Sequence, residues 1–323
     1  MTDIIIYAVL GLGGLLAGGA ILIPGVVSLA RQMGLPAVAV AVIVIAGGTS
    51  APELIVSADA SLFGNPGIVW GNLIGSNIAN IALVLGLGML VQPVKANATS
   101  RHQLTGLIIV TLLIAGICLN GGITGLTRYP VSVGLLIGFA VYLFWLMRHS
   151  PDALHKDGQR QTMTEDKLAK GMSPTRAAIS ATGGVICLVA GADAFVWSGA
   201  ELARNYGWSE DVIGLTIIAV GTSLPEIISV LASLRHRRHD IALGSVVGSN
   251  LFNFTLVLGI AGVLGPLPAS DLTGYFMMPV LIGLTAILVI CTRLNQSLGW
   301  RSGLVFVGFY LAFLSWNLSM FNA

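Results

Sequence analysis

Long apolar stretches alternate with short polar segments along the whole chain. Windows of about 20 apolar residues, bounded by charges, prolines or Gly-Asn turns, predict membrane-spanning helices, because a helix of that length crosses the hydrocarbon core of a bilayer. The ten predicted spans are residues 4–29, 38–60, 68–91, 104–119, 129–147, 177–202, 211–234, 241–264, 274–292 and 298–318. The long polar stretch 148–176 is predicted to be a linker between two halves, residues 1–147 and 177–323.

Composition narrows the class of protein. Of the 323 residues, 55% are hydrophobic and only 9% are charged, and the mean hydropathy is +0.89. Soluble domains carry about 25% charged residues, and a globular interior is too small to hide this much apolar sequence. The composition predicts an all-α polytopic membrane protein in contact with the lipid bilayer, and it argues against a soluble enzyme or a nucleic-acid-binding protein.

The basic residues predict the orientation, because Lys and Arg are retained on the cytoplasmic side of a membrane. In the ten-span arrangement, fourteen of the sixteen Lys and Arg lie on the side that includes the linker, and only Arg128 and Arg204 lie on the other. We therefore expect a protein of the plasma membrane, the inner membrane of a bacterium, with both termini outside and residues 148–176 in the cytoplasm. No feature requires a protein partner, and a monomer is expected.

The chain contains an internal repeat. Residues 46–86 align with residues 219–259 at a constant offset of 173, with 17 identities in 41 positions. The first copy contains GGTSAPELIVS and GNLIGSNIANIALVLG, and the second contains AVGTSLPEIISV and GSVVGSNLFNFTLVLG. Each half holds five predicted spans, an odd number, so the second half must be inverted in the membrane. This predicts two inverted five-helix repeats whose motifs meet near the midplane, as in inverted-repeat transporters.

Matching carboxylates lie inside apolar spans of the two copies. Glu53 and Glu226 would cost several kcal/mol if ionised without a neutralising partner, so intramembrane glutamates indicate function by default. Pro52 and Pro225 precede them, and a proline inside a helix removes an N–H and displaces the carbonyl four residues earlier. We expect each helix to break at its glutamate. The carbonyls expected to lose helical partners are those around Ala46, Thr49, Ala219 and Thr222.

Hydroxyl and amide groups add further oxygen donors around the two glutamates. They belong to Thr49, Ser50, Ser76, Asn77 and Asn80 in the first copy and to Thr222, Ser223, Ser249, Asn250 and Asn253 in the second. For any single Ser or Asn, an interhelical hydrogen bond is an equally good interpretation. Their convergence favours a cation site, and hard oxygen donors suit Na+ and Ca2+ and not Zn2+ or copper. No activated nucleophile or cofactor motif accompanies them, so an enzyme is not expected.

The paired motifs resemble those of the cation/calcium exchangers (CaCA), specifically the sodium/calcium exchanger branch of prokaryotic type, whose alpha-repeats carry G-T-S-x-P-E and G-S-N-x-x-N patterns. The resemblance covers nearly the whole chain. It implies an antiporter in which Ca2+ and Na+ compete for one central site, with Glu53 and Glu226 chelating Ca2+ beside the carbonyls of Thr49 and Thr222. It further implies two flanking Na+ sites, one formed by Ala46, Thr49, Ser50, Ser223 and Glu226 and one by Ala219, Thr222, Ser249, Ser76 and Glu53.

Two points remain open within this resemblance. Some relatives have Asp where this chain has Asn253, so a third carboxylate is missing, although Asn80 and Asn253 still offer amide oxygens as candidate ligands. Protonation of both glutamates would also neutralise the site, so a proton/Ca2+ antiporter is the alternative function.

The glycines of the first span predict close, smooth packing, and we expect the first and sixth spans to slide against the core.

Overall fold

The computed structural model describes residues 2–149, 172–207, 221, 223–294 and 297–321. The first half contains α1 (Thr2–Met33), α2 (Ala37–Ala41), the π-helical turn η1 (Val42–Ala46), α3 (Gly47–Thr49), α4 (Ala51–Leu62), α5 (Pro66–Ala79), the π-helical turn η2 (Asn80–Val84), α6 (Leu85–Val91), α7 (Ala98–Leu119), the 3-10 turn η3 (Gly125–Thr127) and α8 (Arg128–His149). The second half contains α10 (Pro174–Asn205), α13 (Leu224–Arg235), α14 (His239–Phe252), the π-helical turns η5 (Asn253–Val257) and η6 (Leu272–Met277), α15 (Leu258–Leu264), α16 (Met278–Leu294) and α17 (Trp300–Phe321).

The secondary structure repeats with the sequence. Helices α4, α5 and α6 reappear as α13, α14 and α15 with every boundary shifted by 173 residues, and the π-helical turn η2 reappears as η5 at the same shift. The long helices α1 and α10 have 32 residues each. The internal repeat is therefore a repeat of structural elements, including the π-helical turn that follows α5 and α14.

Seven helices of the described chain are long and apolar enough to cross a membrane, and the segments Ala37–Thr49 and Ala51–Leu62, bent by 52°, form an eighth candidate span. These eight coincide with eight of the predicted spans. The predicted span 298–318 coincides with α17, which is outside that count, and the first part of the predicted span 211–234 lies outside the described residues. The predicted total of ten thus stays a prediction. Most of the predicted linker, residues 150–171, also lies outside the described part.

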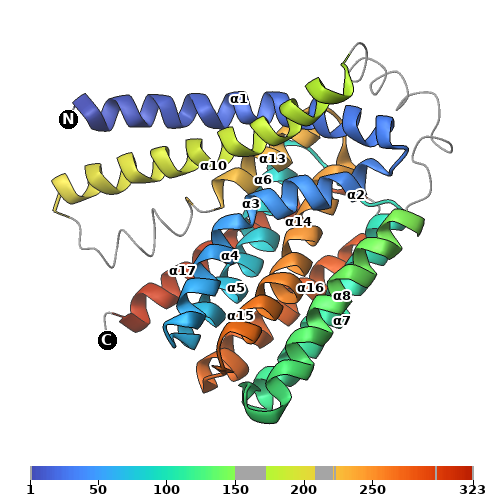
Figure 1. Cartoon of the computed structure of the whole chain (residues 1–323). Helices are drawn as coiled ribbons and strands as arrows, with labels where there is room; N and C mark the ends of the chain where they lie inside the picture. Colours follow the sequence, from blue (N-terminus) through green and yellow to red (C-terminus); the bar gives the residue numbers. More distant parts are fainter. Residues whose placement is uncertain (1, 150–171, 208–220, 222, 295–296, 322–323) are drawn as a thin grey trace.

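Helices α1 and α10 lie side by side and cross the remaining helices at a steep angle (Figure 1). Glycines let the two backbones touch. A Cβ on Gly18 would lie 2.8 Å from the carbonyl oxygen of Gly184, and one on Gly191 would lie 2.7 Å from the amide nitrogen of Leu15. Because the close contacts at these glycines join α1 to α10 and not to the other helices, the two form a tightly packed pair, as small residues do between membrane helices.

The motif-bearing helices lie at the centre. In the span Pro66–Val91, 72% of the most apolar window is buried, and in His239–Leu264 the share is 83%, against 28% for α1 and 17% for Gly125–Arg148. Fully buried Trp70 and Phe254 belong to the main hydrophobic cluster, which takes residues from both halves. The repeated motifs are therefore enclosed by protein and not by lipid.

Two short antiparallel sheets join the halves. Strand β1 (Val94–Lys95) pairs with β4 (Ser297–Leu298), and β2 (Gly122–Ile123) pairs with β3 (Leu267–Pro268). Gly122 has φ of 87°, a left-handed conformation that suits glycine. Each strand of the first half thus has its partner in the second half.

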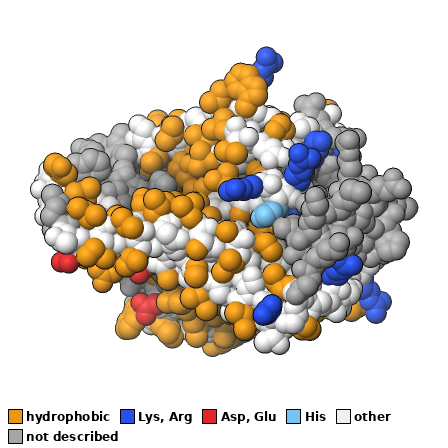
Figure 2. All heavy atoms as spheres, turned by 90° about the horizontal axis from the view of Figure 1, so that it is seen from above, with side chains coloured by type: hydrophobic (Ala, Val, Ile, Leu, Met, Phe, Trp, Pro, Cys, Tyr) orange, Lys and Arg blue, Asp and Glu red, His pale blue; other side chains and the backbone are white. Residues whose placement is uncertain are grey.

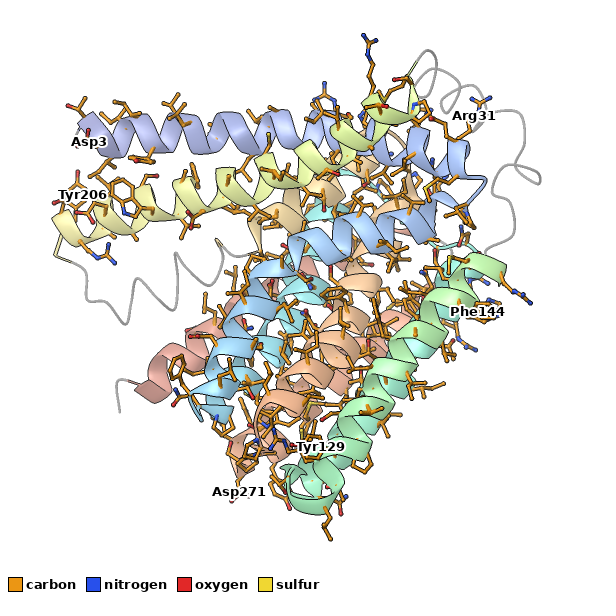
Figure 3. The ribbon with its side chains drawn as sticks, in the orientation of Figure 1. Asp3, Arg31, Tyr129, Phe144, Tyr206 and Asp271 are labelled. Atoms are coloured by element: carbon orange, nitrogen blue, oxygen red, sulfur yellow. The ribbon has the colours of Figure 1, made fainter. Side chains whose placement is uncertain are left out.

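The outer surface is apolar. Figure 2 shows hydrophobic side chains over much of one face, and Ile5, Val9 and Leu16 of α1 are each about 60% exposed. An exposed apolar band of this kind is typical of lipid contact. In Figure 3, Arg31 lies at the upper right and Phe144 at the right near mid-height, whereas Tyr129 and Asp271 lie at the bottom and Asp3 and Tyr206 at the left.

Candidate functional site

The helix that carries Glu53 is interrupted just before it. Helix α3 ends at Thr49, Ser50 leaves the helical conformation (φ −87°, ψ 9°), and α4 begins at Ala51 with Pro52 in its first turn. Proline is tolerated there because the first N–H groups of a helix have no intrahelical acceptor. Glu53 therefore lies in the first turn of a helix that starts inside the apolar span, where the helix dipole favours negative charge.

The second copy repeats this geometry. Ser223 has φ −88° and ψ 0°, and α13 begins at Leu224 with Pro225 and Glu226 in its first turn. Each glutamate carboxyl accepts a hydrogen bond from its own backbone N–H. The local sequence S-x-P-E thus fixes two carboxyl groups in the same way, at the start of two equivalent helices.

The position of the break and the state of one carbonyl correct the sequence prediction. The helix breaks at Ser50 and Ser223, three residues before each glutamate and not at it. The carbonyl of Ala46 keeps a helical partner, because the Ser50 N–H donates to it at 3.0 Å. The proline is accommodated because a new helix starts beside it, and the Ala46 carbonyl in the preceding turn keeps its N–H donor. A carbonyl oxygen with one donor still has a second lone pair for a ligand.

The two glutamates are buried and lie close enough to interact. Glu53 is 6% exposed and Glu226 is 4% exposed, and their carboxyl groups interact electrostatically. The Glu53 carboxyl faces the Ser76 hydroxyl of α5. The Glu226 carboxyl faces the hydroxyl of Thr49, which belongs to the other half of the chain and donates to the Ile45 carbonyl at 2.9 Å. Residues of the two motifs are therefore interleaved.

Several buried oxygens in this region have no hydrogen-bond partner among the described residues. They are Oγ of Ser50, Oε2 of Glu53, Oε2 of Glu226 and Oδ1 of Asn253. Native proteins satisfy nearly all buried polar atoms, so a cluster of unsatisfied acceptors requires an explanation such as an ion or water. All four belong to the residues that the sequence predicts as ligands.

Asparagines of the G-S-N-x-x-N motifs bind one another across the two halves. Asn77 donates to the backbone carbonyl of Asn250 at 3.3 Å, and Asn250 donates to that of Asn77 at 3.1 Å. Asn80 and Asn253 donate to the side-chain oxygens of Asn250 and Asn77. The interpretation of these asparagines as interhelical links is correct for their amide nitrogens. The sequence predicted that the two motifs meet, but it did not indicate which asparagines would pair.

The structure places Glu53 beside Ser76 and Glu226, and Glu226 beside Thr49. Asn80 and Asn253 bind asparagines of the opposite half, and Ala46, Ser50, Ser223 and Ser249 are buried in the same repeated segments. Ala219 and Thr222 lie outside the described residues. Asn72 was missed: its amide donates to the Glu53 carbonyl at 3.2 Å and to the Ser57 hydroxyl at 3.0 Å. Its position four residues before Ser76 places it on the same helix face, but its repeat mate is Ser245, so the repeat gave no signal.

The donor set consists of oxygen. Two carboxylates, hydroxyls and amide oxygens suit hard cations such as Ca2+ and Na+. Among the described residues, no group of three or more His, Cys, Asp or Glu is placed to hold a metal ion. The charge available to a cation at this site is therefore that of two glutamates.

A groove of about 630 Å³ between α7 and α8 is separate from this region. Its lining is mostly apolar and includes Val110, Leu135, Tyr142 and Leu251. None of the predicted ligands lines it. We therefore assign the candidate ion site to the enclosed oxygen cluster and not to this groove.

Comparison with known proteins identifies the family. The family model described as sodium/calcium exchanger protein matches residues 4–148 and 177–319. The putative antiporter CaxA of Alkalimonas amylolytica is 31% identical over 96% of this chain and 98% of its own length, and the sodium/calcium exchanger MaX1 of Methanosarcina acetivorans is 28% identical over 94% and 95%.

A solved structure agrees with these relatives. The sodium-calcium exchanger NCX_Mj, soaked with 10 mM Na+ and no Ca2+, superposes with a TM-score of 0.82 at 28% identity, covering 97% of this chain and 98% of that one. Family model, relatives and fold all span both halves. They describe a transporter and not an enzyme, and the chain belongs to the sodium/calcium exchanger family.

Proposed function

We propose that this chain is an antiporter that exchanges Ca2+ for Na+ by alternating access at the paired glutamates. The observation that carries the proposal is the pair of buried carboxyls, one from each half, whose Oε2 atoms lack donors among the described residues. Glu53, Glu226 and the carbonyls of Thr49 and Thr222 would bind Ca2+. Ala46, Ala219, Ser50, Ser223, Ser76 and Ser249 would complete two flanking Na+ sites.

Charge gives obligatory exchange a physical cause. Two ionised glutamates are balanced by one Ca2+ or by two or more Na+. A half-empty site would leave an uncompensated carboxylate in a medium of low dielectric constant, which makes the crossing between the two states unfavourable. Only a protein with its site occupied then changes between the two access states, so Ca2+ moves in one direction when Na+ moves in the other.

The repeat supports the two states. Because α4–α6 and α13–α15 are equivalent elements with opposite predicted orientation, exchanging the conformations of the two halves would convert a site open to one side into a site open to the other. In this proposal the ten spans form two inverted five-helix repeats, both termini are outside, residues 148–176 are cytoplasmic, and one chain is the transporting unit. The α1–α10 pair slides as a unit against the central helices.

The deciding experiment compares driving ions. Purified protein in liposomes loaded with Na+ is expected to take up 45Ca2+ after dilution into Na+-free medium, and a Na+ ionophore that dissipates the gradient should stop the uptake. Liposomes with an outward H+ gradient and no Na+ are expected to show only the background of protein-free liposomes. Uptake driven by protons and indifferent to Na+ would establish the proton/Ca2+ alternative in place of Na+ exchange.

Exchange is expected to proceed without K+. The positions that could carry a third carboxylate, Asn80 and its repeat mate Asn253, contribute amide dipoles and no formal charge, so the charge needed to hold an additional cation is missing. Na+-driven Ca2+ flux should be equal in K+-free and K+-containing media. An absolute requirement for K+ in the unmodified protein would contradict this, and would mean that another oxygen cluster binds the extra ion.

A further inference from the structure

The four asparagines of the two G-S-N-x-x-N motifs form one hydrogen-bonded network, which ends at Asn80 and Asn253. All four side chains are buried, and each of the four hydrogen bonds among them joins one half of the chain to the other. The Asn80 amide nitrogen lies 3.0 Å from Oδ1 of Asn250, and the Asn253 amide nitrogen lies 3.0 Å from Oδ1 of Asn77. The first pair of asparagines therefore contacts the second pair directly.

Two backbone carbonyls fix the orientation of every amide in this network. A backbone carbonyl can only accept, so the Asn77 side chain must turn its nitrogen toward the Asn250 carbonyl. Its Oδ1 then faces Asn253 and requires a donor there, which is the Asn253 nitrogen. The same reasoning from the Asn77 carbonyl through Asn250 orients Asn80. The oxygen and nitrogen of each amide are thus set by chemistry and not by an arbitrary choice of rotamer.

The orientation leaves the oxygens of Asn80 and Asn253 for the ion site. Asn253 Oδ1 is buried and has no donor among the described residues. Asn80 lies one helical turn after Ser76, whose hydroxyl faces the Glu53 carboxyl, and residues four apart share a helix face. If either amide were reversed, it would present an NH2 group, which repels a cation, in place of an oxygen.

We propose that Asn77 and Asn250 are positioning residues that hold the amide oxygens of Asn253 and Asn80 toward the transported cation. This inference rests on the proposed function only in taking Ca2+ as a cation that binds at the paired glutamates. Asn77 and Asn250 themselves touch the neighbouring asparagines and not the ion. Each half of the chain in this way orients a ligand that belongs to the other half.

The test is Ca2+ binding to detergent-purified protein in Na+-free buffer, measured by titration calorimetry. Asn77→Leu and Asn250→Leu are expected to weaken Ca2+ binding about tenfold each, the cost of losing one good polar contact. The matched control is Gln103→Leu, which removes another buried interhelical amide, bonded to Tyr142, and is expected to leave Ca2+ affinity unchanged.

A double-mutant cycle separates orientation from general structure. An Asp side chain presents oxygen in either orientation, so Asn77→Leu is expected to leave Ca2+ affinity unchanged in an Asn253→Asp background. In an Asn80→Asp background the tenfold cost of Asn77→Leu should persist, because Asn80 is oriented by Asn250. If a Leu variant is not monodisperse, Asn77→Ser serves in the same cycle, since its shorter side chain cannot reach the Asn253 amide.

The outcomes are distinct. Unchanged Ca2+ affinity in the folded single variants, or an equal loss in both Asp backgrounds, would overturn the positioning role. A wild-type protein that binds Ca2+ but does not exchange it for Na+ would refute the proposed function instead, and the binding cycle would still decide the role of Asn77.

Discussion

Replacing Glu53 with Gln is expected to abolish Ca2+ exchange, and Glu226→Gln is expected to do the same. Each change keeps the shape of a side chain that is almost completely buried and removes one of the two charges at the site. Two unit charges about 4 Å apart interact with about 4 kcal/mol at an effective dielectric constant of 20, so losing one carboxylate beside a divalent cation should lower Ca2+ affinity by at least about a thousandfold. Na+-driven 45Ca2+ uptake into liposomes measures the effect.

Glu201→Gln provides the matched control. Glu201 lies on α10, is 37% exposed and pairs with Arg204 at 3.1 Å, so its loss should leave uptake near the wild-type rate because exposed ion pairs contribute little. Near-normal Ca2+ exchange by Glu53→Gln or Glu226→Gln would remove that glutamate from the site.

Asn77→Ala is expected to have a smaller effect on transport than either glutamate substitution.

The α1–α10 interface should be intolerant of a single methyl group. Gly18→Ala is expected to lower the thermal unfolding midpoint of the purified protein by several degrees and to slow exchange. The new Cβ would lie 2.8 Å from the Gly184 carbonyl oxygen and 2.9 Å from the Leu188 amide nitrogen. Both are backbone atoms of α10, and they cannot move away unless the two helices separate. Overpacking of this kind typically costs about 1–3 kcal/mol.

The same helix offers a control for this substitution. Gly13 has no atom within 4 Å of a Cβ built on it, so Gly13→Ala adds the same methyl group to α1 without a clash. Its unfolding midpoint is expected to stay unchanged or rise slightly, because alanine favours a helix more than glycine. Equal midpoints for the two variants would show that the close backbone contact at Gly18 does not stabilise the pair.

Sequence reasoning predicted the parts of this fold that depend on local pattern. Apolar length gives the spans because a membrane permits little besides helices, and the offset of 173 carries over to the element boundaries because equal sequences face equal constraints. The S-x-P-E motif correctly predicted that the helix is interrupted near its proline. Its exact position was wrong, since the chain starts a new helix at Ala51 and thereby puts Pro52 where no N–H is needed.

Other features depend on which residues meet in space, and a single sequence does not contain that information. The contact of Thr49 with Glu226 and the network of asparagines both join residues 170 or more positions apart. The π-helical turns η2 and η5, which begin at Asn80 and Asn253, have no signature in apolar periodicity. Asn72, which donates to the backbone carbonyl of Glu53, was missed because the search relied on identity between repeats and its repeat mate is Ser245.

The two small sheets have the symmetry of a two-fold dimer. Strand β3 is the repeat equivalent of β1, and β4 follows β2 at nearly the same offset, so the pairings of β1 with β4 and of β3 with β2 are one contact made twice. If residues 1–149 existed alone, β1 and β2 would both lack partners, and a second copy would satisfy all four strands through a two-fold axis. The strand pairing is therefore that of a two-fold dimer contained in a single polypeptide.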